Sequence, residues 1–119
     1  MTSALIEIKT VEHFPSARIV SLQGDIDELS LQDLTKHIAE MTREEKIRDV
    51  IVDLNNVTFM NSKGLSQLIV VYNMLSSQQK QLILAGANEF VTDLISMVGV
   101  MKMIPYFVTL EEAISSLSS

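Results

Sequence analysis

The residues most suited to chemistry are the four small or polar residues NSKG at positions 61–64, which separate two apolar segments of the chain. The hydroxyl of Ser62 is open to three roles at such a junction: capping a helix, accepting a phosphate or acting as a nucleophile. As a cap it would stabilise the helix by about 0.5–2 kcal/mol relative to alanine. As a phosphoserine it would place a charge of about −1.5 to −2 against the positive end of the helix dipole. General statistics favour the cap.

A nucleophilic role for Ser62 requires a nearby general base, and the sequence has only two histidines. His13 falls in an expected loop and His37 on the mostly polar side of an expected helix, so neither is directed at the serine. The sequence also has no cysteine, which excludes disulfides, thiolate metal sites and a cysteine nucleophile. We therefore predict that the protein is not an enzyme and that it has no metal site and no cofactor.

Length and composition restrict the class of protein. A chain of 119 residues has the size of one compact domain, and its 47% hydrophobic residues are enough to form a core. The formal net charge of −6, with only nine Lys and Arg, argues against nucleic acid as a partner. No segment approaches the roughly 20 apolar residues that span a bilayer, and the N-terminus lacks the features of a signal peptide. We therefore expect no membrane insertion and a cytoplasmic location.

The elements that must position Ser62 follow from the hydrophobic pattern. Residues 5–10 and 17–23 alternate as strands, and Gly24 is expected to end the second strand. An amphipathic helix is expected from Ser30, which would cap it, with Asp33 in the place of a capping-box acid. The remaining elements are, in order, a central strand at 50–54, a helix at 65–75, a strand at 82–85, a helix capped by Asn88 and ended by Gly99, a strand at 106–110, and a last helix with the capping-box pair Thr109 and Glu112.

This order, β β α β α β α β α, predicts an α/β fold with a mixed sheet of about five strands and about four helices packed on it. Functional residues of such folds lie where strands end and helices begin, and Ser62 is at such a place. The side chains of Met60 and Leu65 are predicted to lie in the core. The methionines at 97, 101 and 103 are also expected to pack, and the alternative is that residues 98–103 contribute to a docking face.

Residues 50–69, VIVDLNNVTFMNSKGLSQLI, resemble the signature of bacterial anti-sigma factor antagonists of the STAS domain family, a hydrophobic strand followed by D-L-x-x-V-x-F-M-D-S-[ST/A]-G-L. Residues 20–30, VSLQGDIDELS, are similar to the family's L-x-G-x-[LI]-D segment. Residues 94–104, LISMVGVMKMI, are similar to its M-x-G-[LV] stretch. Because the three segments occur in the right order, the chain is identified as a member of this family, with a single STAS domain over residues 1–119.

The resemblance implies a partner-switching mechanism. In such proteins the unphosphorylated antagonist binds an anti-sigma factor that is also an ATP-dependent serine kinase, and so frees the sigma factor. Phosphorylation of the signature serine, which corresponds to Ser62, ends the binding, and a metal-dependent serine phosphatase reverses it. Asp27 corresponds to the family's acidic residue after Gly24, and it is implied to lie near Ser62 in the same binding surface. A phosphate beside this carboxylate would be repelled.

The predicted partner-binding surface consists of Gly24, Asp25, Asp27, Asn61, Ser62, Lys63, Gly64 and Leu65. The alternative for the acidic part of this set is that Asp25, Asp27 and Glu28 form a solvated loop that begins the first helix. Two further functions remain open for the same fold: an accessory subunit of a lipid-transporting ABC system, or a regulator of a partner other than a sigma system. A small hydrolase that uses Ser62 ranks last.

The chain departs from the family's signature at two positions that flank Ser62. Asn61 replaces the usual aspartate and Lys63 replaces a small residue, so that NSKG carries one positive charge where D-S-S-G carries one negative charge. Asn61 can form hydrogen bonds but cannot accept a proton, which predicts slow or absent phosphorylation. Lys63 could instead pair with a phosphate and weaken the repulsion that drives release. Alternatively, both are ordinary substitutions that the fold tolerates.

Overall fold

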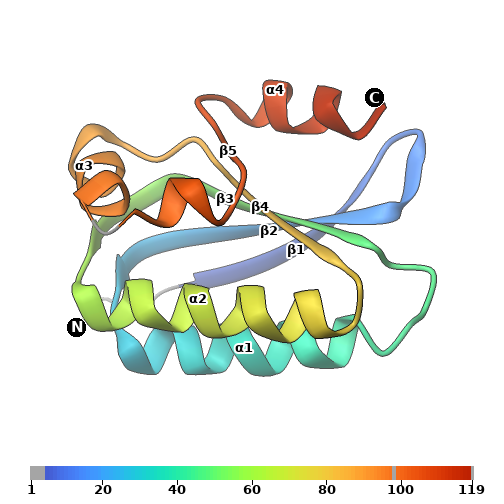
Figure 1. Cartoon of the computed structure of the whole chain (residues 1–119), viewed down its shortest axis with the longest axis horizontal. Coiled ribbons are helices and arrows are strands. Elements are labelled where there is room, and N and C mark those ends of the chain that lie inside the picture. The colour runs from blue at the N-terminus through green and yellow to red at the C-terminus, as the bar shows by residue number, and fades with distance from the viewer. Residues whose placement is uncertain (1–4, 98, 119) are drawn as a thin grey trace.

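The computed structural model of the chain describes residues 5–97 and 99–118. The predicted order of elements is confirmed, with two short 3-10 turns added near the C-terminus (Figure 1). The elements are β1 (Leu5–Val11), β2 (Phe14–Ile26), α1 (Glu28–Met41), β3 (Asp49–Met60), α2 (Ser62–Ser77), β4 (Gln81–Ala85), α3 (Glu89–Met97), η1 (Val100–Lys102), β5 (Tyr106–Phe107), α4 (Leu110–Ser115) and η2 (Ser116–Ser118).

The strands form one mixed sheet in the order β1-β2-β3-β4-β5, so the chain has the α/β fold that was predicted. β1 and β2 form the expected antiparallel hairpin, and every later pairing is parallel. β3 is the central strand and its residues 50–54 are buried. Val50, Val52 and Leu54 belong to one hydrophobic cluster while Ile51 belongs to another, because successive side chains point to opposite faces of a sheet.

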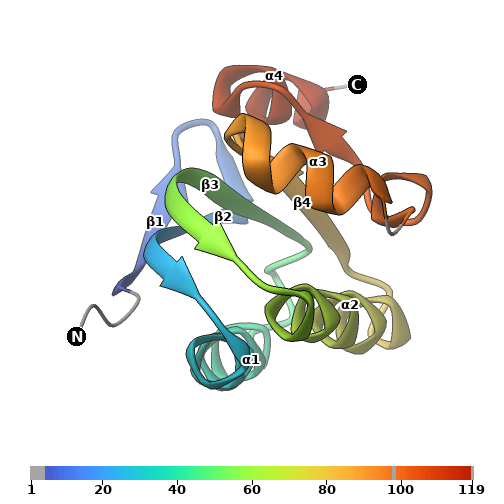
Figure 2. The ribbon, with the colours of Figure 1, turned by 90° about the vertical axis from the view of Figure 1, so that its left-hand side faces the viewer.

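Helices cover the two faces of the sheet. α1 and α2 lie side by side on one face, and α4 lies on the other (Figures 1 and 2). The core between the sheet and the helix pair includes Leu34 and Ile38 of α1, and Leu68 and Val71 of α2, all with no exposed surface. Ala113 of α4 is buried in the smaller cluster on the opposite face. Among the described residues, no helix has the length and apolar character needed to cross a membrane.

β2 and β3 are both longer than predicted. β2 does not end at Gly24 but continues to Ile26, with a positive φ of 96° at the glycine and a register shift directly after it. β3 continues past Leu54 to Met60, and among the described strands this extension pairs only with β2, because β4 pairs no further than Asp53 of β3. The prediction failed here because glycine and polar residues usually end a strand. Bulges in this ladder accommodate them.

Asp53 stabilises the first of these irregularities. The residue is 7% exposed, and its carboxylate accepts hydrogen bonds from the hydroxyl of Ser21 on β2 (3.2 Å) and from the backbone N–H of Asn55 (3.0 Å). The register between β2 and β3 shifts at this point, between Ser21 and Gln23. A buried carboxylate with two donors thus supports the start of the strand extension that leads to Ser62.

The first helix begins earlier than predicted. α1 starts at Glu28, and its N-cap is Asp27 instead of Ser30. The N–H and the hydroxyl of Ser30 both donate to Asp27 Oδ1, at 2.9 and 3.0 Å. Aspartate and serine cap helices about equally well, so the sequence allowed either choice. The predicted caps Asn88 and Thr109 are confirmed, by N–H donors of Val91 and Glu112.

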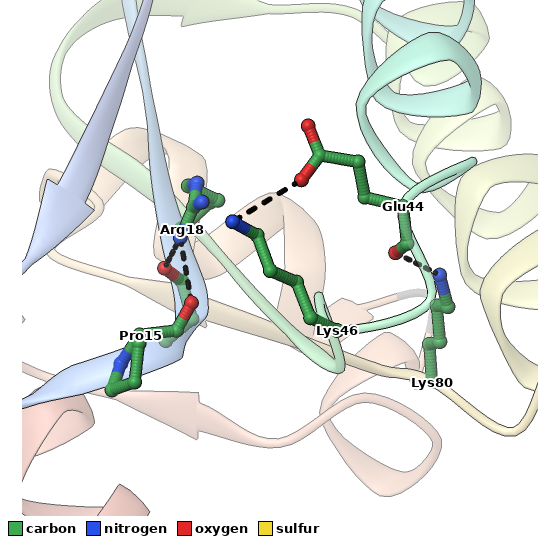
Figure 3. A network of polar contacts seen from close by, with 6 residues as sticks. Pro15, Arg18, Glu44, Lys46 and Lys80 are labelled. Carbon is green, nitrogen blue, oxygen red and sulfur yellow. Dashed lines mark hydrogen bonds and ion pairs between the residues drawn. The ribbon is translucent and has the colours of Figure 1, made fainter.

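Lys80 connects two loops at the end of the molecule opposite to Ser62. Its ammonium group donates to the backbone carbonyl oxygen of Thr42. It also donates to the carbonyl oxygen of Glu44 at 3.2 Å (Figure 3). The ammonium group of Lys46 forms an exposed ion pair with the Glu44 carboxylate at 3.4 Å. Lys80 therefore joins the loop after α1 to the turn before β4, whereas the ion pair of Lys46 is local.

These contacts predict different effects for two similar substitutions. Lys80→Met should lower the free energy of unfolding by about 1–3 kcal/mol, because it removes hydrogen bonds from a charged donor to backbone carbonyls. Lys46→Met is the matched control and should change it by less than about 1 kcal/mol, since exposed ion pairs contribute little. Urea denaturation measures both values. Equal effects of the two variants would contradict this account of the loop.

Candidate functional site

Two helices begin side by side at one end of the sheet. Ile26 and Met60 are partners in the parallel β2–β3 ladder, and each is followed by a single capping residue, Asp27 for α1 and Asn61 for α2. The N–H of Asn61 donates to the carbonyl of Ile26 (3.3 Å), which ties the two connections together. α1 and α2 then run parallel and in contact (Figure 2). Two positive helix ends therefore lie next to each other.

Ser62 is the first residue of α2, and it does not cap the helix. The predicted capping role belongs to Asn61, whose Oδ1 accepts a hydrogen bond from the N–H of Gly64 at 2.8 Å. Asn61 takes this role because its backbone is extended (φ −98°, ψ 174°), as an N-cap residue requires. The Ser62 side chain is exposed, and its hydroxyl forms no hydrogen bond with the residues that the structure describes. The hydroxyl is therefore available for modification.

The two residues that depart from the family's signature have separate roles. The half-buried amide of Asn61 is used in the cap, and an aspartate could accept the same hydrogen bond. The side chain of Lys63 is exposed, and it forms no ion pair in the described part of the chain. The residue that follows Ser62 therefore carries an exposed positive charge with no ion-pair partner among the described residues.

Gly64 and Leu65 lie on the inner side of the same turn. Gly64 is buried, and a Cβ atom at this position would lie 3.1 Å from the carbonyl oxygen of Ile26 and 3.4 Å from Met60 Cγ. Glycine therefore lets the first turn of α2 approach the end of β2 closely. Leu65 is 2% exposed and Met60 is 1% exposed, which confirms that both pack in the core. The Leu65 side chain is not part of the exposed surface, although the predicted binding set includes it.

Gly24 and Asp25 lie in the strand extension next to the helix starts. The exposed Asp25 carboxylate accepts a hydrogen bond from the hydroxyl of Thr58 on β3 at 2.7 Å. Both residues line an open groove of about 440 Å³, with Asn56 and Asn88 among the other lining residues. The predicted set thus comes together at one end of the molecule, on two strand ends and two helix starts.

Asp27 is both exposed and structural. The N–H and then the hydroxyl of Ser30 hold the pKa of the Asp27 carboxyl below its ordinary value of 3.8, because hydrogen bonds to the carboxylate favour its charged form. Asp27 is thus an exposed residue that begins the first helix, which agrees with the predicted alternative of a solvated acidic segment and adds a capping role to it. Its negative charge also offsets the positive ends of two neighbouring helices.

A model of the STAS domain family matches residues 8–113 of the chain. The chain belongs to the STAS domain family. A curated relative, the anti-sigma F factor antagonist of Paenibacillus polymyxa, is 24% identical over 97 residues, which cover 82% of this chain and 83% of that protein. The family expected from the signature at residues 50–69 is thereby confirmed.

Solved structures show the same STAS fold. An anti-sigma factor antagonist from Mycobacterium paratuberculosis superposes with a TM-score of 0.84 at 21% identity, covering 98% of this chain and 96% of that one. The Bacillus cell fate determinant SpoIIAA in its phosphorylated form gives 0.72 at 17% identity, with 95% and 99% covered. The STAS domain of a SulP transporter from Vibrio cholerae gives 0.74 at 19% identity, with 91% and 84% covered. At these identities the likeness concerns the fold.

The STAS domain also exposes apolar residues that the sequence did not assign to the surface. Phe59 and Phe90 are 44% and 53% exposed, and their rings stack with centroids 5.3 Å apart. Among the methionines expected to pack, Met97 and Met103 are exposed, and only Met101 packs against the core. Val98 lies outside the described residues. The sequence did contain a signal that Phe90 is exposed. Phe90 does not follow the helical spacing of Val91 and Ile95, which form the buried face of α3.

The capping geometry predicts that only one of two neighbouring substitutions lowers the stability of the fold. Asn61→Ala should lower the free energy of unfolding by about 0.5–2 kcal/mol, because the N–H of Gly64 loses its acceptor. Ser62→Ala should leave it within about 0.5 kcal/mol, as for an exposed side chain that forms no hydrogen bond with the described residues. Both values come from urea denaturation of the purified STAS domain. A larger loss for Ser62→Ala than for Asn61→Ala would restore the cap to Ser62.

The lowered pKa of Asp27 predicts a pH-dependent contribution to stability. A carboxyl whose pKa is lower in the folded state stabilises the fold fully above its ordinary value, and loses this contribution as the pH falls through the folded pKa. Asp27→Asn keeps a good capping residue but removes the charge. Wild type should therefore be more stable than the variant at neutral pH, and the difference should shrink as the pH falls below the ordinary pKa of 3.8 and through the lower pKa of the folded state. Urea denaturation across this pH range measures the difference; a constant gap would be the opposite result.

Proposed function

We propose that this STAS domain is an anti-sigma factor antagonist, a cytoplasmic regulatory binding module and not an enzyme, which acts as one domain over residues 1–119. It sequesters an anti-sigma factor that is also a serine kinase, and phosphorylation of Ser62 releases this partner. The observation that carries the proposal is the exposed Ser62 hydroxyl, without a hydrogen bond among the described residues, at the start of α2. The names of the relatives support the same class of partner.

The helix start supports Ser62 as the phosphate acceptor. Asn61 satisfies the N–H of Gly64, and the N–H groups of Ser62 and Lys63 have no acceptor within the helix. Such free donors and the positive helix end favour a phosphate on the neighbouring hydroxyl. The modification therefore does not need to disrupt the fold, because the capping bond of Asn61 stays in place.

The charge of the surface explains how a phosphate would release the partner. The charges of Asp25, Asp27 and Lys63 sum to −1, and a phosphate would add about −1.5 to −2. A partner that fits the unmodified surface would then have to remove water from several negative charges, and this desolvation opposes binding. Lys63 lies closest in sequence to the phosphate and would offset part of this change, so the switch of this chain is weaker than one with a small residue there.

The main prediction concerns Ser62 and the anti-sigma kinase of the same genome. Incubation of the STAS domain with this kinase and ATP should give one phosphate on Ser62, detected by mass spectrometry. Ser62→Asp should weaken binding of the kinase by about tenfold or more, because it adds a negative charge to the end of the molecule that already carries Asp25 and Asp27. Ser66→Ala, which changes an exposed serine one turn later, is the matched control and should behave as wild type. Unchanged affinity of Ser62→Asp would contradict the switch.

Two further variants test the neighbours of Ser62 in the same assay. Asn61→Asp keeps the cap and adds the carboxylate that the signature carries, so phosphorylation should become faster. Lys63→Ser removes the compensating charge, so phosphorylation should weaken kinase binding more strongly than in wild type. If neither variant differs from wild type, the two residues are tolerated substitutions without a regulatory effect.

A second candidate function keeps the fold and changes the partner. It is favoured by the likeness to the STAS domain of a SulP transporter, which shows that this fold also serves in transport systems. In this case the domain would be an accessory subunit of a lipid-transporting ABC system, or the regulator of another non-sigma partner. Co-purification from native cells separates the two functions, because an ATPase subunit would be recovered in place of a serine kinase.

A further inference from the structure

The end of the molecule that carries Ser62 exposes a pair of aromatic rings. Phe59 of β3 and Phe90 of α3 are 44% and 53% exposed, and their ring planes meet at 28° with centroids 5.3 Å apart. Neither side chain belongs to a buried cluster of the fold. Isolated exposed apolar residues are common, but two adjacent aromatic rings form a patch that favours contact with another molecule.

The backbone under both rings is held in place. Phe59 is paired with Asp25 in the β2–β3 ladder and lies two residues before Asn61. The Asn88 side chain donates from Nδ2 to the carbonyl of Val57 (3.0 Å) and accepts from the N–H of Val91 (2.8 Å), which joins the start of α3 to β3. The rings are therefore pre-positioned at the same end as Ser62, and binding would cost little conformational entropy.

Acidic residues flank the pair and select the kind of partner. Asp25 lies beside Phe59 in the ladder, and Glu89 precedes Phe90 on α3; both side chains are exposed. A symmetric contact between two copies would bring these like charges together. An anionic membrane surface would also repel them. The complementary surface is an apolar pocket with basic side chains at its rim.

We propose that Phe59 and Phe90 form an apolar anchor that docks into a basic-rimmed apolar pocket of the anti-sigma factor. This inference rests on the proposed function and adds a division of roles to it. The anchor supplies affinity, because buried aromatic residues at the centre of interfaces contribute most of the binding energy. Ser62, on the neighbouring helix start, controls whether the anchored surfaces can close. Phe90 is not among the buried residues of α3, so the core does not depend on its aromatic ring. The ring is therefore free to contribute to the choice of partner.

The test is isothermal titration of each serine-kinase anti-sigma factor encoded in the source genome with the full-length STAS domain. Phe90→Ala and Phe59→Ala should each weaken binding by about tenfold or more, and Phe90→Asp should abolish it. Val108→Ala, which shortens a 71% exposed apolar side chain next to α4, is the matched control and should bind as wild type. Urea denaturation of each variant shows whether the fold is retained.

The outcomes separate this inference from the proposed function. If wild type binds a kinase and both alanine variants bind it equally well, the anchor is refuted while the antagonist function stands. If wild type binds none of these kinases, the proposed function fails and the anchor fails with it. Loss of self-association or of vesicle binding in Phe90→Ala, with unchanged kinase affinity, would also refute the anchor. Weaker binding at higher salt by wild type would support the basic rim.

Discussion

The parallel pairing of β2 with β3 beyond the end of β4 is the constraint on which the site depends. It places Ile26 beside Met60, and one residue later each strand turns into a helix. The two helices consequently start together, although their positive ends repel each other. Two features compensate for this repulsion. The first turn of α2 packs closely against the carbonyl of Ile26, which the missing Cβ of Gly64 allows, and the carboxylate of Asp27 supplies a negative charge at the start of α1.

The site separates structural and chemical roles between adjacent residues. Asn61 faces inward and completes the helix, so the hydroxyl of Ser62 is left free for chemistry. Asp27 has both roles, because its carboxylate caps α1 and also contributes charge to the surface. The aromatic pair on β3 and α3 adds an apolar part to the same end. Affinity and control can therefore come from different side chains of one surface.

The sequence predicted the elements well where the information is local. Apolar spacing identified the buried faces of α1 and α2, and the continuous apolar run at 50–54 identified the central strand. The strand extensions were missed because they depend on pairing across 32 residues between Ser21 and Asp53, which no local pattern contains. The predicted caps Ser30 and Ser62 were both wrong, because Asp27 and Asn61 are equally good capping residues. These two directly follow the ends of β2 and β3, where the helices begin. The stacking of Phe59 on Phe90 likewise required the tertiary fold.

The four residues at 61–64 differ in how strongly the fold constrains them. Asn61 and Gly64 face the protein, and their replacement would disturb the cap or the contact with Ile26. The side chains of Ser62 and Lys63 are exposed and form no hydrogen bond or ion pair with the described residues. The charge and reactivity of this end can therefore change by mutation at two positions without a folding defect. Such a turn allows descendants of one ancestral domain to diverge in their signalling while they keep the same scaffold.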